Sequence, residues 1–188
     1  MIVCAFTGHR PEKLPFSDEQ HPDCIRLKKQ LYQLCVDMLT RGVTVFLSGM
    51  SRGVDTWAAE CVLRLQTEHP DLAIQLWAAI PYAQQAKGWP AADQERYQLI
   101  LSAASQVFYL SDSYYRGCLH RRNRFMVEHS RYLIAVYNNS SGGTESTIQY
   151  AEKKGLEIFT IQPQKNSAGV NSFLLLTACA LFVLAIIA

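Results

Sequence analysis

The sequence predicts an α/β fold: a Rossmann-like, three-layer arrangement with a mostly parallel sheet between helices. Two observations carry this prediction. Short apolar runs alternate with amphipathic segments over residues 1–162. Within these runs, apolar and polar residues do not alternate as they would in a strand with one solvent-exposed face. Because strands that alternate with helices are joined by right-handed crossovers, they build a parallel sheet covered on both faces.

The expected elements follow in chain order. Strands are predicted at 2–6, 43–48, 73–80, 106–110, 132–137 and 157–161. Helices are predicted at 22–41, 54–68, 92–103, 118–130 and 144–154, the first two with clear apolar stripes. We therefore assign residues 1–162 to one domain, followed by a polar linker at 163–172 and an apolar segment at 173–188.

Composition narrows the class of protein. The chain has 188 residues, 49% hydrophobic content and a formal net charge of +2, which excludes disorder and makes nucleic acid an unlikely partner. Its six cysteines include no C-x-x-C pair and show no zinc spacing, so no metal site is expected. Reduced thiols favour a cytoplasmic domain.

Glycine recurs where the predicted strands end. In parallel sheets, ligands gather at the carboxyl ends of the strands. Three of these ends combine glycine with hydroxyl or basic residues. The candidate ligand-binding residues are Gly8, His9 and Arg10 after the first strand; Ser48, Gly49, Arg52, Gly53 and Asp55 after the second; Pro81 after the third; Asn123 near the start of the fourth helix; and Gly142, Gly143 and Thr144 after the fifth strand.

These residue types suit an anion. A strand, a glycine turn and a helix N-terminus direct free amide groups and a positive dipole end at one point, which favours phosphate or carboxylate. Gly8 would let a ligand approach the backbone, and Arg10 could contact a phosphate through two hydrogen bonds.

Several of these residues have structural alternatives. Arg10 could form a surface ion pair, and His9 could be an acid or base or a structural hydrogen-bonding group. Asp55 could stabilise the helix dipole or accept hydrogen bonds from a ribose. Thr144 is a candidate N-cap, a role compatible with phosphate binding.

The motifs at these ends resemble the YpsA family of the SLOG superfamily. The resemblance rests on Thr7-Gly8-His9-Arg10, on Ser48-Gly49 with Gly53-Val54-Asp55, on Arg122-Asn123 and on Gly142-Gly143-Thr144, and it spans about residues 1–162. It implies a Rossmann-like fold, a nucleotide, NAD-like or ADP-ribose-like ligand at these loops, and a sensor or regulatory role in the bacterial cytoplasm. The superfamily includes DprA and the LONELY GUY phosphoribohydrolases.

One departure separates this chain from the LONELY GUY pattern, P-G-G-x-G-T-x-x-E. Thr147 stands where that pattern has its glutamate, and Glu145 lies on a different face of the helix. We therefore expect a binding module. The alternatives are a hydrolase that uses His9, Asp55 or Glu145, and, with less support, a DprA-like DNA-binding protein.

The apolar segment at 173–188 has one polar residue, Thr177. A helix that is apolar all round is buried or lies in lipid. The expectation is an apolar C-terminal helix that tethers the domain to the inner face of the cell membrane, and the alternative is docking onto the domain or onto a second copy of the chain in a homo-oligomer.

Overall fold

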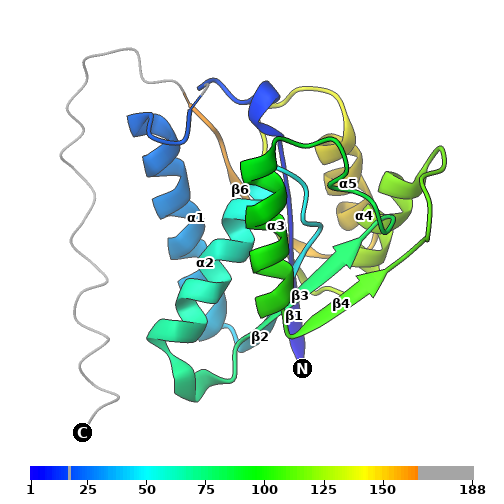
Figure 1. Ribbon diagram of the computed structural model, residues 1–188. Helices are drawn as coiled ribbons and strands as arrows, with labels where there is room; N and C mark the ends of the chain where they lie inside the picture. The colour runs from blue at the N-terminus through cyan, green and yellow to red at the C-terminus, as the bar shows by residue number, and fades with distance from the viewer. Residues whose placement is uncertain (17, 165–188) are drawn as a thin grey trace, which may run out of the picture.

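The computed structural model describes residues 1–16 and 18–164, which form a six-stranded parallel sheet with helices on both faces (Figure 1). The strands are β1 (Ile2–Gly8), β2 (Val43–Ser48), β3 (Gln75–Ile80), β4 (Gln106–Tyr109), β5 (Tyr132–Val136) and β6 (Glu157–Ile161). The helices are α1 (Pro22–Thr40), α2 (Val54–Glu68), α3 (Ala91–Ala103), α4 (Cys118–Glu128) and α5 (Gly143–Lys153), with short 3-10 turns η1 (Pro11–Lys13) and η2 (Pro70–Leu72). The predicted α/β, Rossmann-like class is confirmed.

The strand order is β4-β3-β2-β1-β5-β6. The chain builds outward from β1 through β2 and β3 to β4, then crosses to the other side of β1 to add β5 and β6. The order thus reverses between β1 and β5. Such a reversal opens a crevice at the carboxyl ends of the two strands, which is where ligands bind in open α/β sheets.

Alternation along β1 shows how the layers are held. Cys4 and Phe6 belong to the core that packs against α1, α2 and α3, whereas Val3 and Ala5 belong to the core under α4 and α5. Because both faces are covered, all four side chains are buried, and the strand reads as one continuous apolar run.

The differences from the predicted bounds have local causes. β1 continues to Gly8 because Thr7 and Gly8 pair with Ala135 and Val136 of β5. β3 begins at Gln75, not at residue 73, because Ala73 has φ 47 and ψ 38, a left-handed conformation that a strand excludes.

The predicted apolar C-terminal helix and membrane anchor receive no support from the structure. Residues 165–188 lie outside the described residues, so the anchor and most of the linker do as well. Within residues 1–16 and 18–164, no helix combines the length and apolar character that a membrane span needs.

Candidate functional site

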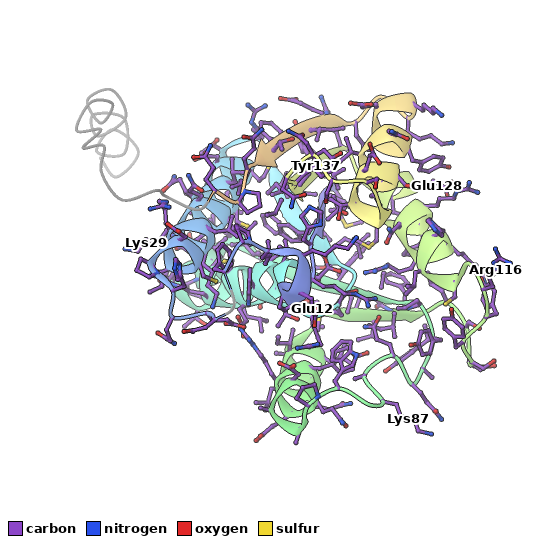
Figure 2. The ribbon with its side chains drawn as sticks, turned by 90° about the horizontal axis from the view of Figure 1, so that it is seen from above. Glu12, Lys29, Lys87, Arg116, Glu128 and Tyr137 are labelled. Atoms are coloured by element: carbon purple, nitrogen blue, oxygen red, sulfur yellow. The ribbon has the colours of Figure 1, made fainter. Side chains whose placement is uncertain are left out.

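A pocket of about 530 Å³ opens at the carboxyl ends of β1 and β5, at the switch point of the sheet. Figure 2 views the molecule from above this edge, where Glu12 marks η1 and Tyr137 marks the end of β5. The volume is typical of small-molecule sites. The lining residues are Phe6, Thr7, Gly8, His9, Arg10, Lys13, Ser51, Asp55, Leu119, His120, Arg122, Asn123, Gly142, Gly143, Thr144 and Ser146.

The pocket brings together most of the predicted site residues. Those that line it are Gly8, His9, Arg10, Asp55, Asn123, Gly142, Gly143 and Thr144. Those that do not are Ser48, Gly49, Arg52, Gly53 and Pro81. The lining group comes from segments far apart in the sequence, as the convergence of parallel strand ends requires. Ligand binding by these residues stays a prediction.

The N-terminus of α5 is open toward the pocket. Its N-cap is Gly142, which has φ 147 and no side-chain capping bond, so Thr144 lies inside the first turn and is not the expected N-cap. The first amide groups of a helix have no partner within the helix. Gly142 and Gly143 are exposed, and a Cβ atom on Gly143 would meet nothing within 4 Å. An anion can therefore approach these amides closely.

Three arginine or lysine side chains line the pocket: Arg10, Lys13 and Arg122. Arg10 and Lys13 are exposed, and neither forms an ion pair with any described residue. The Lys13 Nζ lies 3.3 Å from the position that a Cβ atom on Gly142 would take. Positive charge and the positive end of α5 thus converge. Lys13 was not among the predicted site residues, although it follows Gly8 by only five positions.

The N-terminus of α2, by contrast, is closed by the loop after β1. The amide of Val54 donates to the carbonyl oxygen of His9 at 3.4 Å. Gly53 has φ 83, and a Cβ atom there would lie 2.8 Å from the His9 carbonyl oxygen and 2.9 Å from Cδ of Pro11. The glycine turn between β2 and α2 was predicted to face a ligand, but it packs against the loop after β1.

Asp55 in the first turn of α2 forms a buried ion pair with Arg122 of α4. The Asp55 Oδ2 accepts hydrogen bonds from Arg122 Nη1 at 3.0 Å and from the Ser51 amide at 3.2 Å. Arg122 Nη2 also donates to Ser51 Oγ at 3.1 Å, whereas Arg122 Nε has no partner in the described part of the chain. The exposed fractions of the two side chains are only 7% for Arg122 and 8% for Asp55. This pair forms one wall of the pocket.

Two glycines are required by neighbouring side chains. A Cβ atom on Gly49 would lie 1.2 Å from Arg122 Nη1, so the bare backbone lets the guanidinium reach Asp55. A Cβ atom on Gly8 would lie 2.4 Å from Cγ1 of Val54. Gly8 thus allows β1 and α2 to pack closely, a requirement that explains it without any ligand.

His9 holds the ends of β1 and β5 together. Its side chain is buried, and Nε2 accepts a hydrogen bond from the Asn138 amide at 3.4 Å. Burial lowers the pKa of His9; a hydrogen bond with the Asn138 side chain opposes this shift, and the nearby Lys13 charge adds to it. Of the two alternatives, the geometry favours a neutral structural imidazole.

Thr147 fastens α5 to α4. Asn123 Nδ2 donates to Thr147 Oγ1 at 2.7 Å, and that hydroxyl donates to the Gly143 carbonyl oxygen at 2.7 Å. Glu145 lies near Tyr137, whose pKa is raised by burial and by the Glu145 carboxylate. Thr147, which stands at the position of the LONELY GUY glutamate, thus has a structural role, because it links α4 to the first turn of α5.

The remaining predicted residues hold the β2–α2 turn and its surroundings. Arg52 forms ion pairs with Glu12 and Asp93, each at 2.7 Å. Ser48 Oγ donates to the Asp55 carbonyl oxygen at 2.8 Å, and Pro81 is buried at the end of β3. These residues shape the site from outside the pocket.

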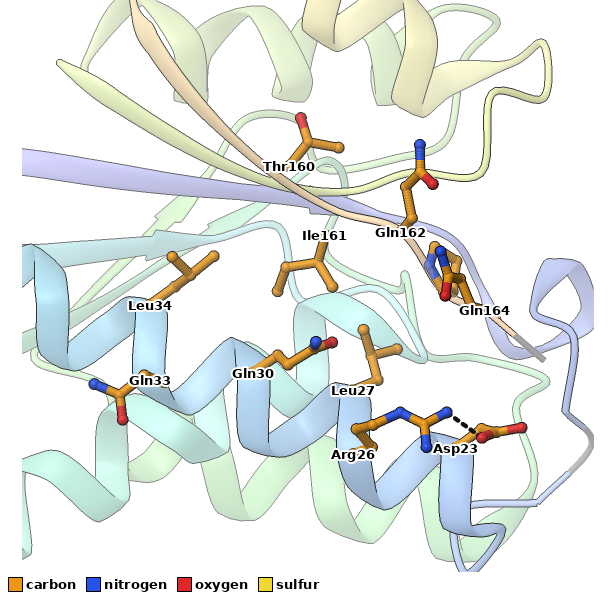
Figure 3. A pocket seen from close by; sticks show the side chains of 11 residues that line it. Asp23, Arg26, Leu27, Gln30, Gln33, Leu34, Thr160, Ile161, Gln162 and Gln164 are labelled. Carbon is orange, nitrogen blue, oxygen red and sulfur yellow. Dashed lines mark hydrogen bonds and ion pairs between the residues drawn. The ribbon is translucent and has the colours of Figure 1, made fainter. Parts of the chain in front are cut away.

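A second pocket, of about 430 Å³, lies between α1 and β6 (Figure 3). Leu27, Leu34 and Ile161 give it an apolar floor, and its charged side chains are Arg26 and Asp23, which form an ion pair with each other. Because this pair is neutral as a whole, the pocket has no net charge to attract an anion. The pocket at the switch point is the better candidate.

The chain is similar in sequence to a known protein family. The chain matches the model of the YpsA family, described as the YspA SLOG family, over residues 4–166. It is 32% identical over 160 residues to a "UPF0398 protein" of Bacillus thuringiensis (strain Al Hakam), a match that covers 84% of this chain and 86% of the relative. A "UPF0398 protein" of Bacillus cereus (strain ATCC 14579) is 32% identical over 158 residues, covering 82% and 85%.

Two solved structures with a similar fold are those of DNA-processing proteins. DNA processing protein A (DprA) from Helicobacter pylori, described for its single-stranded DNA binding mode, has a TM-score of 0.58 and 21% identity. DprA from Streptococcus pneumoniae has a TM-score of 0.57 and 19% identity. The match covers 85% of this chain in both cases, but only 64% and 50% of the respective DprA chains.

These likenesses correct one expectation. Nucleic acid was predicted to be an unlikely partner because the net charge is only +2. That prediction is wrong, because a protein with a similar fold, the one from Helicobacter pylori, is described as binding single-stranded DNA. A net charge describes the whole chain and does not say where its cations lie.

Proposed function

This chain belongs to the YpsA family of SLOG proteins, and from that premise we propose that its pocket binds a nucleotide-derived ligand, with a phosphate group at the N-terminus of α5. A mononucleotide, NAD or ADP-ribose would suit this site, and the protein would act as a sensor or regulatory module. The observation that carries the proposal is the open glycine turn at Gly142 and Gly143 beside Arg10 and Lys13, whose side chains form no ion pair with the described residues.

The electrostatics of the pocket support an anionic ligand. The carboxylate of Asp55 is already paired with Arg122, so it does not offset the charges of Arg10 and Lys13. The open amides of α5 add a partial positive charge. A phosphate group would satisfy these amides and both cations at once, and phosphate bound at helix N-termini uses the same arrangement.

Isothermal titration calorimetry with AMP, NAD and ADP-ribose tests the proposal. We expect at least one of them to bind, and Lys13→Ala to weaken that binding by about tenfold because a charge-assisted hydrogen bond is lost. Lys29→Ala is the matched control, since Lys29 is exposed on α1, well away from η1 (Figure 2).

Adenosine, which lacks phosphate, is the control ligand. Affinity for adenosine equal to that for AMP would show that the phosphate is not recognised. Failure of all three phosphorylated ligands to bind would overturn the proposal.

Single-stranded DNA is a second candidate ligand. The likeness to DprA favours it, as do the exposed Arg121 and Arg124 on α4, close to the pocket. Association with a labelled oligothymidylate should then weaken with added salt and with Lys13→Ala, but not with Lys29→Ala. No association at low salt would remove this candidate.

A further inference from the structure

We infer that the ligand carries a second phosphate group, held in an adjoining cleft between α4 and α5. This inference rests on the proposed function, because the first phosphate is the one placed at the N-terminus of α5. The cleft has a volume of about 170 Å³ and adjoins the main pocket.

Two facing helical stripes make the walls of the cleft. From α4 come His120, Asn123 and Arg124, at steps of three and four residues. From α5 come Ser146, Thr147, Gln149, Tyr150 and Lys153, which follow the same helical period. The buried core under α4 and α5 contains Met126, Val127 and Ala151, and the two stripes of the cleft lie outside it. They are polar or cationic at nearly every position, so they offer a ligand hydrogen bonds and positive charge.

The cleft and the main pocket are continuous. His120, Asn123 and Ser146 line both of them. The open first turn of α5 contributes Gly143 to the main pocket, and Ser146, one turn further along the helix, leads into the cleft. One ligand can therefore place a phosphate at each end of this surface.

The charge of the cleft is unbalanced. Arg124 and Lys153 bring two positive charges, the cleft lining contains no carboxylate, and neither cation forms an ion pair within the described ranges. The nearby carboxylate of Glu128 accepts the hydroxyl hydrogen of Tyr150 at 2.5 Å. The Arg124 guanidinium lies over the Tyr150 ring, 5.4 Å from its centroid, so it is held at the edge of the cleft.

These features define the chemical class of the ligand. A nucleoside monophosphate would fill the α5 site and leave both cations of the cleft unpaired. A nucleotide with a second, separated phosphate, such as a nucleoside bisphosphate or a dinucleotide phosphorylated on a ribose, would pair with them. The hydroxyl of Ser146 and the amide of Gln149 supply further hydrogen-bond donors.

Calorimetric titration with AMP and with the 2′,5′- and 3′,5′-bisphosphates of adenosine tests this inference. At least one bisphosphate is expected to bind about tenfold more tightly than AMP, because it adds charge-assisted hydrogen bonds. Lys153→Ala should remove that gain without changing the affinity for AMP. Lys29→Ala is the matched control, because it removes the same charge from an exposed position on α1, outside the cleft lining.

A second variant, Gln149→Glu, places a carboxylate in the cleft and should also abolish the gain. If AMP binds and neither bisphosphate binds more tightly, the inference is overturned and the proposed function stands. Equal losses of affinity in Lys153→Ala and Lys29→Ala would also overturn it, since they would indicate a general attraction of the ligand to positive charge. If none of the nucleotides binds, both proposals fail.

If a bisphosphate does bind more tightly than AMP, the affinity for NADP is compared with that for NAD. This comparison shows whether the second phosphate belongs to a dinucleotide.

Discussion

Replacing Arg122 with methionine is expected to lower the free energy of unfolding by about 3–5 kcal/mol, because removing one partner of a buried ion pair leaves the other charge unpaired. Asp55 would lose the guanidinium that lies 3.0 Å from its Oδ2, and Ser51 would lose a hydrogen bond as well. Methionine fills most of the vacated space, so the cost is mainly electrostatic. Chemical denaturation measures it.

Two further variants isolate the buried charge. Arg121→Met makes the same replacement at the preceding, exposed position, where surface substitutions change stability by less than about 0.5 kcal/mol. The double variant Arg122→Met with Asp55→Leu removes both charges and should recover most of the lost stability. A single Arg122→Met variant as stable as the wild type would contradict the importance of this pair.

The second large effect is expected at Gly53, where alanine should lower the free energy of unfolding by about 2–4 kcal/mol, since strain at positive φ adds to a steric clash. The residue has φ 83, and a Cβ atom would lie 2.8 Å from the His9 carbonyl oxygen, a backbone atom that cannot turn away. The loop after β1, which carries Arg10, would have to move.

Gly155 provides the matched control for Gly53. Its φ of 75 is similar, but a Cβ atom there would meet nothing within 4 Å. Gly155→Ala should therefore cost only the conformational strain of about 1 kcal/mol. If thermal or chemical denaturation shows equal losses for the two variants, the close contact between the β1 loop and α2 has no energetic weight.

The fold could be predicted from the sequence because most of the strands are buried on both faces. Their apolar runs and the amphipathic stripes of α1 and α2 depend on local residue order, so the bounds of β2, α2 and β6 were predicted without error. The convergence of the glycine turns also followed from topology, since parallel strands end at one edge.

What the sequence could not reveal is which glycine turn is open. The turn after β2 and the turn after β5 have similar residues, yet the first is covered by the loop that contains His9 and Pro11. Arg122 reaches Asp55 across 67 positions of the chain, and no local pattern signals that pairing. Tertiary contacts therefore cover the N-terminus of α2, where the motif is longest, and leave that of α5 open.

An NMR titration of the ¹⁵N-labelled protein with AMP shows directly which helix N-terminus binds the phosphate. We predict that the largest changes in amide chemical shift fall on Gly143, Thr144 and Glu145, at the open N-terminus of α5, and that the amide shifts of Val54, Asp55 and Thr56 change little. The largest shifts at Val54–Thr56, or no shift at either helix end, would contradict this prediction.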